Sequence, residues 1–134
     1  MVADAQGNVS ARDGERVYVT GRGVCLATAT AGEVSVVDLD GRLLDGPEPS
    51  SELRVHLGIY AAFPETRAVV HGHVLPPEGA APVAPYAPEG SQELADNVVA
   101  AMASGAALVV MERHGTVARG ATLEEALATS SAAP

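Results

Sequence analysis

The feature that most constrains this chain is a short apolar strand that ends in two histidines. Residues 67–74 read Arg-Ala-Val-Val-His-Gly-His-Val. Residues i and i+2 of a strand point to the same face, so His71 and His73 project together. A second apolar run, residues 106–111, is followed by His114-Gly115. If the two strands are neighbours, three imidazoles converge at their ends, a set that suits a catalytic zinc with one open position.

The alternative for His71 and His73 is a structural one. Two histidines at the end of a strand can simply be surface residues where the strand runs out into solvent. A third histidine, His114, follows another apolar strand and precedes a glycine. This repetition favours the metal site over the surface interpretation.

Size and charge exclude several classes of function. A chain of 134 residues with 47% apolar residues predicts one domain, residues 1–134, with a core of its own. The net charge of −9 argues against nucleic acid and against anionic membrane surfaces as partners. An anionic substrate would need a local device in such a protein: a helix N-terminus, a few arginines or a metal.

Cysteine content and hydropathy point to a compartment. Cys25 is the one cysteine of the sequence, so no intrachain disulfide is expected, which fits a reducing cytoplasm. No apolar run approaches the roughly 18 residues of a membrane span, and no charged-then-apolar leader precedes the first motif. We therefore expect a cytoplasmic protein without a signal peptide.

The N-terminal part of the chain is typical of β-hairpins. Asp13-Gly14 favours a tight turn between strands at residues 9–12 and 16–20. Residues 33–38 and 42–44 form a second alternating pair. Four strands are therefore expected before the first helix.

That helix is expected over residues 50–62. Ser50 and Ser51 are favoured N-cap residues, and Glu52 in the first turn suits the helix dipole. Leu53, Leu57 and Tyr60 form the predicted inward stripe, and His56 is expected to be solvated or at the edge of the core. A helix N-terminus with free amides and two hydroxyls is also a ready anion site.

The remaining elements complete a mixed α/β pattern. A short strand is expected near residues 82–86, then a helix over residues 92–104 capped by Gly90-Ser91, with Leu94, Val98 and Met102 buried. A strand at residues 116–118 precedes a last helix that Thr122 caps and that is cut short near residue 128. The order predicts an α/β fold: a mixed, largely antiparallel central sheet with helices on its faces.

Several short motifs, taken together, resemble one family. In chain order they are Gly7-Asn8-Val9-Ser10, the 20–23 loop, Pro49-Ser50-Ser51-Glu52, His71-Gly72-His73, Ala84-Pro85-Tyr86, Gly90-Ser91-Gln92-Glu93-Leu94, His114-Gly115 and Leu123-Glu124-Glu125-Ala126. This series resembles the class II aldolase/adducin superfamily, whose prototypes are the fuculose- and rhamnulose-phosphate aldolases. Relative to that pattern, the chain is expected to be shortened at both ends and after the His-x-His motif.

The resemblance implies a role for each matched position. It makes His71, His73 and His114 the ligands of Zn²⁺, with another divalent metal as the alternative, and Glu52 the catalytic acid/base. It places a substrate-phosphate site at Gly7, Asn8, Arg22, Gly23, Ser50 and Ser51. The implied reaction is reversible aldol cleavage of a small sugar phosphate to dihydroxyacetone phosphate and an aldehyde.

Two alternatives and an assembly state accompany this resemblance. Another activity of the superfamily (dehydratase, epimerase or decarboxylase) is one alternative, since fold does not fix function. A non-catalytic, adducin-like binding or assembly domain is the other. The resemblance also implies a homo-oligomer, dimer or tetramer, that covers apolar sheet surface near Val34, Val36, Leu43 and Leu44.

Overall fold

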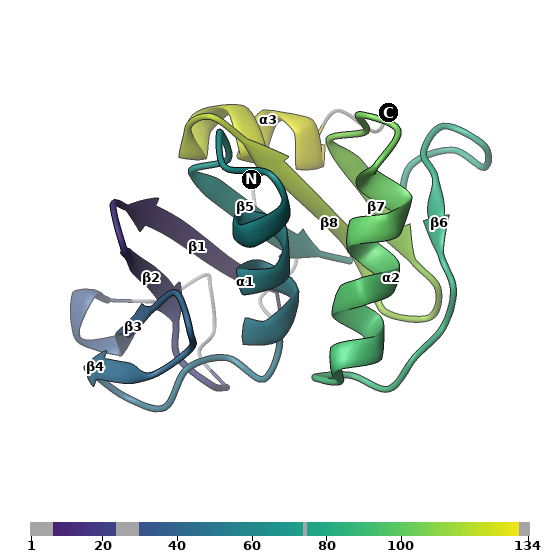
Figure 1. The fold of residues 1–134 in the computed structure, drawn as a ribbon. Coiled ribbons are helices and arrows are strands. Elements are labelled where there is room, and N and C mark those ends of the chain that lie inside the picture. Colours follow the sequence, from purple (N-terminus) through teal and green to yellow (C-terminus); the bar gives the residue numbers. More distant parts are fainter. Residues whose placement is uncertain (1–6, 24–29, 74, 132–134) are drawn as a thin grey trace.

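The computed structural model describes residues 7–23, 30–73 and 75–131, and its central feature is an eight-stranded sheet. Its strands lie in the order β4-β3-β2-β1-β5-β8-β7-β6 (Figure 1), and all neighbours are antiparallel except β6 and β7. The strands are β1 Asn8–Asp13, β2 Arg16–Thr20, β3 Val34–Asp38, β4 Leu43–Asp45, β5 Ala68–Gly72, β6 Val83–Ala84, β7 Leu108–Met111 and β8 Gly115–Gly120. The prediction of a mixed, largely antiparallel sheet is confirmed.

Local turn chemistry accounts for the first hairpin. Asp13 and Arg16 are paired at its end, and Gly14 between them has φ +61, a backbone angle that glycine adopts without steric cost. Alternate residues of β2 and β3 are buried, with Val17, Val19 and Val37 fully enclosed. The period-2 pattern of these strands therefore fixes which face meets the core.

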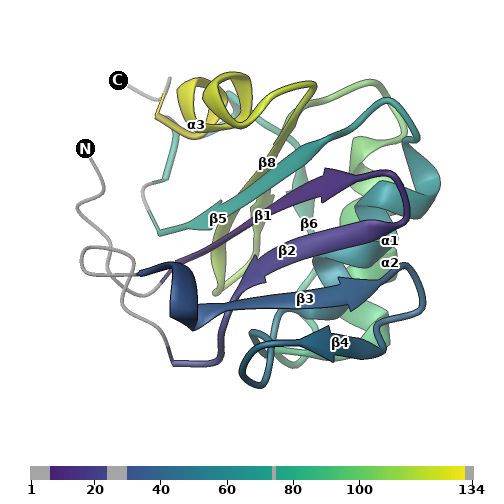
Figure 2. The same ribbon diagram turned by 90° about the vertical axis from the view of Figure 1, so that its left-hand side faces the viewer.

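Helices cover the two faces of the sheet unequally. Helices α1 (Leu53–Ala62) and α2 (Gln92–Met102) pack against each other on one face, and α3 (Leu123–Ser131) packs on β5 and β8 on the other (Figure 2). The larger core lies under α1 and α2, and a smaller cluster of Ala68, Val70 and Ala126 lies under α3. This arrangement leaves the N-terminal ends of α1 and α2 at the same end of the sheet as the histidines.

The first helix differs from its prediction in its start and its buried side. It begins at Leu53 with Glu52 at the N-cap, and Ser50 lies before it. The buried side chains are Val55, His56, Ile59 and Tyr60, not the predicted stripe of Leu53, Leu57 and Tyr60, of which only Tyr60 is buried. The prediction that His56 is solvated or at the core edge is wrong, because its side chain is 0% exposed. Polar partners on β1, described below, make this burial tolerable.

Helix α2 agrees with its prediction. Ser91 is the N-cap, and its side chain accepts a hydrogen bond from the Leu94 N–H at 3.1 Å. Leu94, Val98 and Met102 are fully buried as predicted.

In the C-terminal half one condition is not met and one expectation is corrected. Strands β5 and β7 are not neighbours, because β8 lies between them and pairs with both. Helix α3 is not cut short near residue 128 but continues to Ser131, since its apolar side packs on β5 and β8. Thr122 does accept a bond from the Glu125 N–H, as a helix cap should.

The four apolar residues predicted to lie at the surface, on β3 and β4, are exposed or half-buried. Leu43 and Leu44 are 45% and 47% exposed, while Val34 and Val36 are half-buried. Within the described ranges, no helix is long and apolar enough to cross a membrane. Cys25 falls outside these ranges.

Candidate active site

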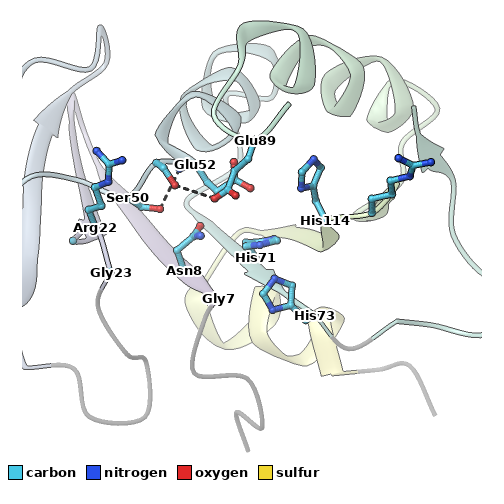
Figure 3. Close-up of a pocket in the computed structure, with 13 residues that line it drawn as sticks. Gly7, Asn8, Arg22, Gly23, Ser50, Glu52, His71, His73, Glu89 and His114 are labelled. Atoms are coloured by element: carbon cyan, nitrogen blue, oxygen red, sulfur yellow. Dashed lines mark hydrogen bonds between the residues drawn. The ribbon is translucent and has the colours of Figure 1, made fainter. Parts of the chain in front are cut away.

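One cavity of about 630 Å³ gathers residues from both halves of the chain. It forms where β1 begins, where β5 ends and where the segments before α1 and α2 meet (Figure 3). The ten site residues predicted from the sequence all line it: Gly7, Asn8, Arg22, Gly23, Ser50, Ser51, Glu52, His71, His73 and His114. Gly21, Glu89 and Arg113 line it as well. The structure therefore brings together every predicted site residue.

Gly115 permits the close approach that joins the two histidine motifs. It has φ +98, and a Cβ atom built there would lie 2.3 Å from the Gly72 carbonyl oxygen and 2.7 Å from Cδ2 of His73. No other residue type has room at this position. The glycine after His114 is therefore what lets β8 lie against the His71-Gly72-His73 segment.

His71 is held in a defined tautomer. It is the cross-strand partner of Asn8, is 5% exposed, and its Nδ1 lies 2.8 Å from the Thr116 carbonyl oxygen. A carbonyl only accepts, so Nδ1 carries a proton, and in the neutral ring Nε2 is then the nitrogen with the lone pair. This is the second contact that metal-binding histidines usually make, because it orients the ring.

His73 lies just beyond the end of β5, in a bend, and is exposed. Its ring meets that of His71 edge-on, with 5.0 Å between the ring centroids. The two imidazoles thus project to one place, as the strand periodicity predicts.

His114 lines the same cavity, but its side chain contacts Ala87 and Tyr86. Its Nε2 lies 2.8 Å from the Ala87 carbonyl oxygen, and its ring stacks on Tyr86 with 5.4 Å between centroids. Nε2 therefore carries the proton in this arrangement. Across the described ranges, no group of three or more His, Cys, Asp or Glu side chains is already placed to hold a metal ion.

Glu52 is a buried carboxyl between the histidines and the N-terminal loops. It is 3% exposed, and its Oε1 accepts a hydrogen bond from the Gly90 N–H at 3.2 Å. Burial raises the pKa of Glu52, and the negative charge of Glu89 raises it further, against the opposing effects of the Gly90 bond, His114 and His73. Such a group can exchange protons closer to neutral pH than an ordinary glutamate.

The other side of the cavity carries hydrogen-bond donors. The Ser50 hydroxyl is buried and accepts from the Glu52 N–H at 3.2 Å, whereas the Ser51 hydroxyl donates to Glu89 at 3.1 Å. Arg22 pairs with Glu48 at 3.3 Å, and both side chains are more than 60% exposed. An exposed pair of this kind contributes little to stability, so Arg22 can exchange this partner for an anion at small cost.

Sequence reasoning missed Glu89 and Arg113. Glu89 precedes the cap of α2, a place where the sequence offers only a turn signal, Pro88-Glu89-Gly90. Arg113 has φ +69 and is the only residue other than glycine with positive φ in the described ranges. Its guanidinium lies 5.2 Å from the centre of the Tyr86 ring, on the side of the cavity near His114. A charged residue directly before His114 was the available signal.

Comparison with known proteins gives matches to one family along most of the chain. The profile of the Class II Aldolase and Adducin N-terminal domain matches residues 1–76 and 74–133. An L-fuculose phosphate aldolase of Methanococcus maripaludis is 33% identical over 145 residues, covering 93% of this chain and 78% of the relative. A 5-methylthioribulose-1-phosphate/5-deoxyribulose-1-phosphate aldolase of Escherichia coli strain S88 is 33% identical over 142 residues, covering 90% and 66%.

A solved structure shows the same fold. An L-fuculose 1-phosphate aldolase superposes with a TM-score of 0.87 at 26% identity, covering 96% of this chain and 71% of that one. The alignment of 145 residues with the Methanococcus maripaludis relative exceeds the 134 residues of this chain, so parts of that relative have no counterpart here. The chain belongs to the class II aldolase and adducin family, and within it is a class II aldolase-like lyase.

Proposed function

We propose that this protein is a zinc-dependent aldehyde-lyase that cleaves a small ketose 1-phosphate reversibly to dihydroxyacetone phosphate and an aldehyde. The observation that carries the proposal is the shared cavity: anion-binding groups, a buried carboxyl and three imidazoles line one space of about 630 Å³. By their names, the two relatives reported above are aldolases of ketose phosphates, in agreement with this combination.

The cavity offers the types of ligand atom that zinc prefers. Zinc takes imidazole nitrogen and carboxylate oxygen, and catalytic sites use three protein ligands with one open position. His71 would bind the metal through Nε2, because its Nδ1 contacts the Thr116 carbonyl, and His73 lies against it. His114 would join them once Nε2 leaves the Ala87 carbonyl. When bound, the metal supplies a Lewis acid that polarises the substrate carbonyl.

The other residues that line the cavity would bind the phosphate and transfer the proton, according to where they lie. The backbone N–H groups and hydroxyls around Gly7, Asn8, Gly23, Ser50 and Ser51 would hold the phosphate, with Arg22 neutralising part of its charge. Glu52 would remove and return the proton at the carbon that becomes nucleophilic, since it lies between the phosphate side and the imidazoles. Burial favours this role because it keeps the carboxyl in a poorly solvated place where its pKa is raised.

Metal analysis followed by a substrate screen tests the proposal. The purified protein should bind one zinc per chain, and replacing His71, His73 and His114 together by Ala should abolish stoichiometric metal. The zinc-loaded protein should release dihydroxyacetone phosphate from at least one of a panel of ketose 1-phosphates, and removal of the metal with a chelator should stop the release. One zinc per chain in the triple variant would place the metal elsewhere.

Another activity on the same superfamily site would give a different outcome in the same screen. A dehydratase, epimerase or decarboxylase would consume a sugar phosphate without releasing dihydroxyacetone phosphate. An adducin-like binding domain would consume none of the panel. Following both substrate loss and triose release therefore separates the three functions.

A further inference from the structure

A buried polar chain runs from α1 to Asn8 at the edge of the cavity, and its members His56, Ser10 and Tyr60 have no role in the mechanism above. His56 Nε2 lies 2.5 Å from Oδ1 of Asn8, and His56 Nδ1 lies 2.5 Å from Oγ of Ser10. Ser10 Oγ in turn lies 2.8 Å from the Tyr60 hydroxyl. The four side chains are between 0% and 5% exposed. Polar residues therefore occupy the core-facing positions at the start of β1, where apolar residues would pack more easily.

His56 has one ring proton to place in this chain. Complete burial lowers the pKa of His56 to about 3, so the imidazole is neutral at any working pH. A neutral ring donates from one nitrogen and accepts at the other. Two arrangements of the chain are therefore conceivable, and they orient the Asn8 amide in opposite ways.

Only one arrangement gives every proton an acceptor. The Tyr60 hydroxyl donates to Ser10, Ser10 donates to Nδ1 of His56, and Nε2–H donates to Oδ1 of Asn8. In the reverse arrangement Ser10 donates to Tyr60, whose own proton then has no acceptor among the described residues. A buried hydroxyl proton without a partner is costly, so the first arrangement is favoured.

The favoured arrangement fixes which end of the Asn8 amide meets the cavity. Oδ1 is occupied by His56, so the NH₂ group remains for a partner in the cavity that Asn8 lines. We infer that His56 is a positioning residue that holds the Asn8 side chain as a hydrogen-bond donor to an oxygen of the substrate's phosphate. The phosphate part of this inference rests on the proposed function; the orientation of Asn8 does not.

This orientation of the Asn8 amide favours anion binding in an acidic protein. The protein carries a net charge of −9, and Glu52 and Glu89 line the same cavity as Asn8. An amide oxygen turned toward the phosphate would add to the repulsion, whereas an amide NH₂ offers attraction without a further charge. The buried imidazole of His56 thus determines that the NH₂ end of the Asn8 amide, and not its oxygen, faces the anion.

The tautomer of His56 is directly measurable in the free protein. A long-range proton–nitrogen NMR spectrum of histidine-labelled protein should show His56 protonated at Nε2 and unchanged between pH 5 and pH 8, with the assignment made by the signals lost in His56→Met. A His56 protonated at Nδ1 would turn the Asn8 amide around and overturn the inference. This measurement needs no ligand, metal or activity. If His56→Met fails to fold, the single variants His71→Ala, His73→Ala and His114→Ala assign the other three histidines, and the remaining signals belong to His56.

A double-mutant cycle tests the consequence for binding. Glycerol 3-phosphate is the probe, and its Kd is measured by calorimetry for wild type, Asn8→Ala, His56→Met and the double variant. Each single change should weaken binding about 10- to 100-fold, the worth of about one hydrogen bond to a charged group. The double variant should be no weaker than Asn8→Ala, because His56 acts only through Asn8. Multiplying effects would show that His56 supports the site in another way.

Tyr60→Phe is the matched control. It removes the outermost hydroxyl of the chain but leaves the bond between His56 and Asn8, so the Kd should change less than 2-fold even though stability falls. A loss as large as that of His56→Met would mean that any damage to the buried chain disturbs binding, against a specific role for His56. Absence of glycerol 3-phosphate binding in wild type would count against the proposed phosphate site, while the tautomer would still decide the orientation of Asn8.

Discussion

Replacing Gly115 by Ala tests the contact that joins the two histidine motifs. Alanine would have to adopt φ +98, a left-handed angle that costs an L-residue about 1–2 kcal/mol. Its Cβ would also meet the Gly72 carbonyl oxygen at 2.3 Å and the His73 ring at 2.7 Å. Relieving such overlap in a packed region costs about 1–3 kcal/mol. The expected loss of unfolding free energy is therefore roughly 2–5 kcal/mol.

Gly105→Ala is the matched control for the backbone angle. Gly105 has φ +99, and an added Cβ there would have no atom within 4 Å. This variant should lose only the angle cost of about 1–2 kcal/mol. The difference between the two variants then measures the contact with β5 alone.

Urea unfolding and zinc content form the assay for this pair. Gly115→Ala should lower the urea midpoint clearly more than Gly105→Ala, at an unchanged m-value. It should also lose zinc, because His73 must move, whereas Gly105→Ala should keep it. Equal midpoints and equal zinc in the two variants would refute the close approach of β8 to His73.

Three further predictions concern charge and assembly. The pKa of Glu52 is raised, so just above pH 4.5 the folded state binds more protons than the unfolded state. The stability of the wild type should therefore fall as the pH rises through that window. Urea unfolding of Glu52→Gln should not show this fall. If both respond alike, the carboxyl is not buried as described. Glu89→Gln removes a charge that raises the pKa of Glu52, so the acidic limb of the pH dependence of kcat/KM should move to lower pH, and an unmoved limb would exclude that coupling. Light scattering at micromolar concentration should show a dimer or tetramer, because Leu43 and Leu44 are exposed beside half-buried valines; a clean 13.5 kDa monomer would contradict this.

Local patterns carried most of what the sequence could predict. The hairpin at Asp13-Gly14 and the N-cap of α2 at Ser91 depend on residues that are neighbours in the chain. The pairing of His71 and His73 depends only on the period of a strand. The family resemblance then supplied the grouping of distant motifs, and the shared cavity agrees with it.

What could not be predicted depends on contacts between distant segments. His56 is buried because Asn8 and Ser10, 48 and 46 residues away, offer it hydrogen bonds. His114 is turned toward Ala87, 27 residues away, and no periodicity reports that contact. The insertion of β8 between β5 and β7 follows from strand pairing across the whole sheet. The available hint was the polar alternation Asn8-Val9-Ser10 at the start of β1, which marks a strand whose inner face needs polar partners.

Proton exchange into dihydroxyacetone phosphate tests the central claim without knowledge of the aldehyde. The zinc-loaded protein is incubated with this triose phosphate in D₂O, and NMR follows the hydrogens on the carbon that would become nucleophilic. The proposed function predicts exchange of one of these two hydrogens, lost on removal of the metal and lost in Glu52→Gln with zinc still bound. No exchange by the zinc-loaded wild type, or undiminished exchange by Glu52→Gln, would contradict the assignment of this cavity as an aldolase site with Glu52 as its base.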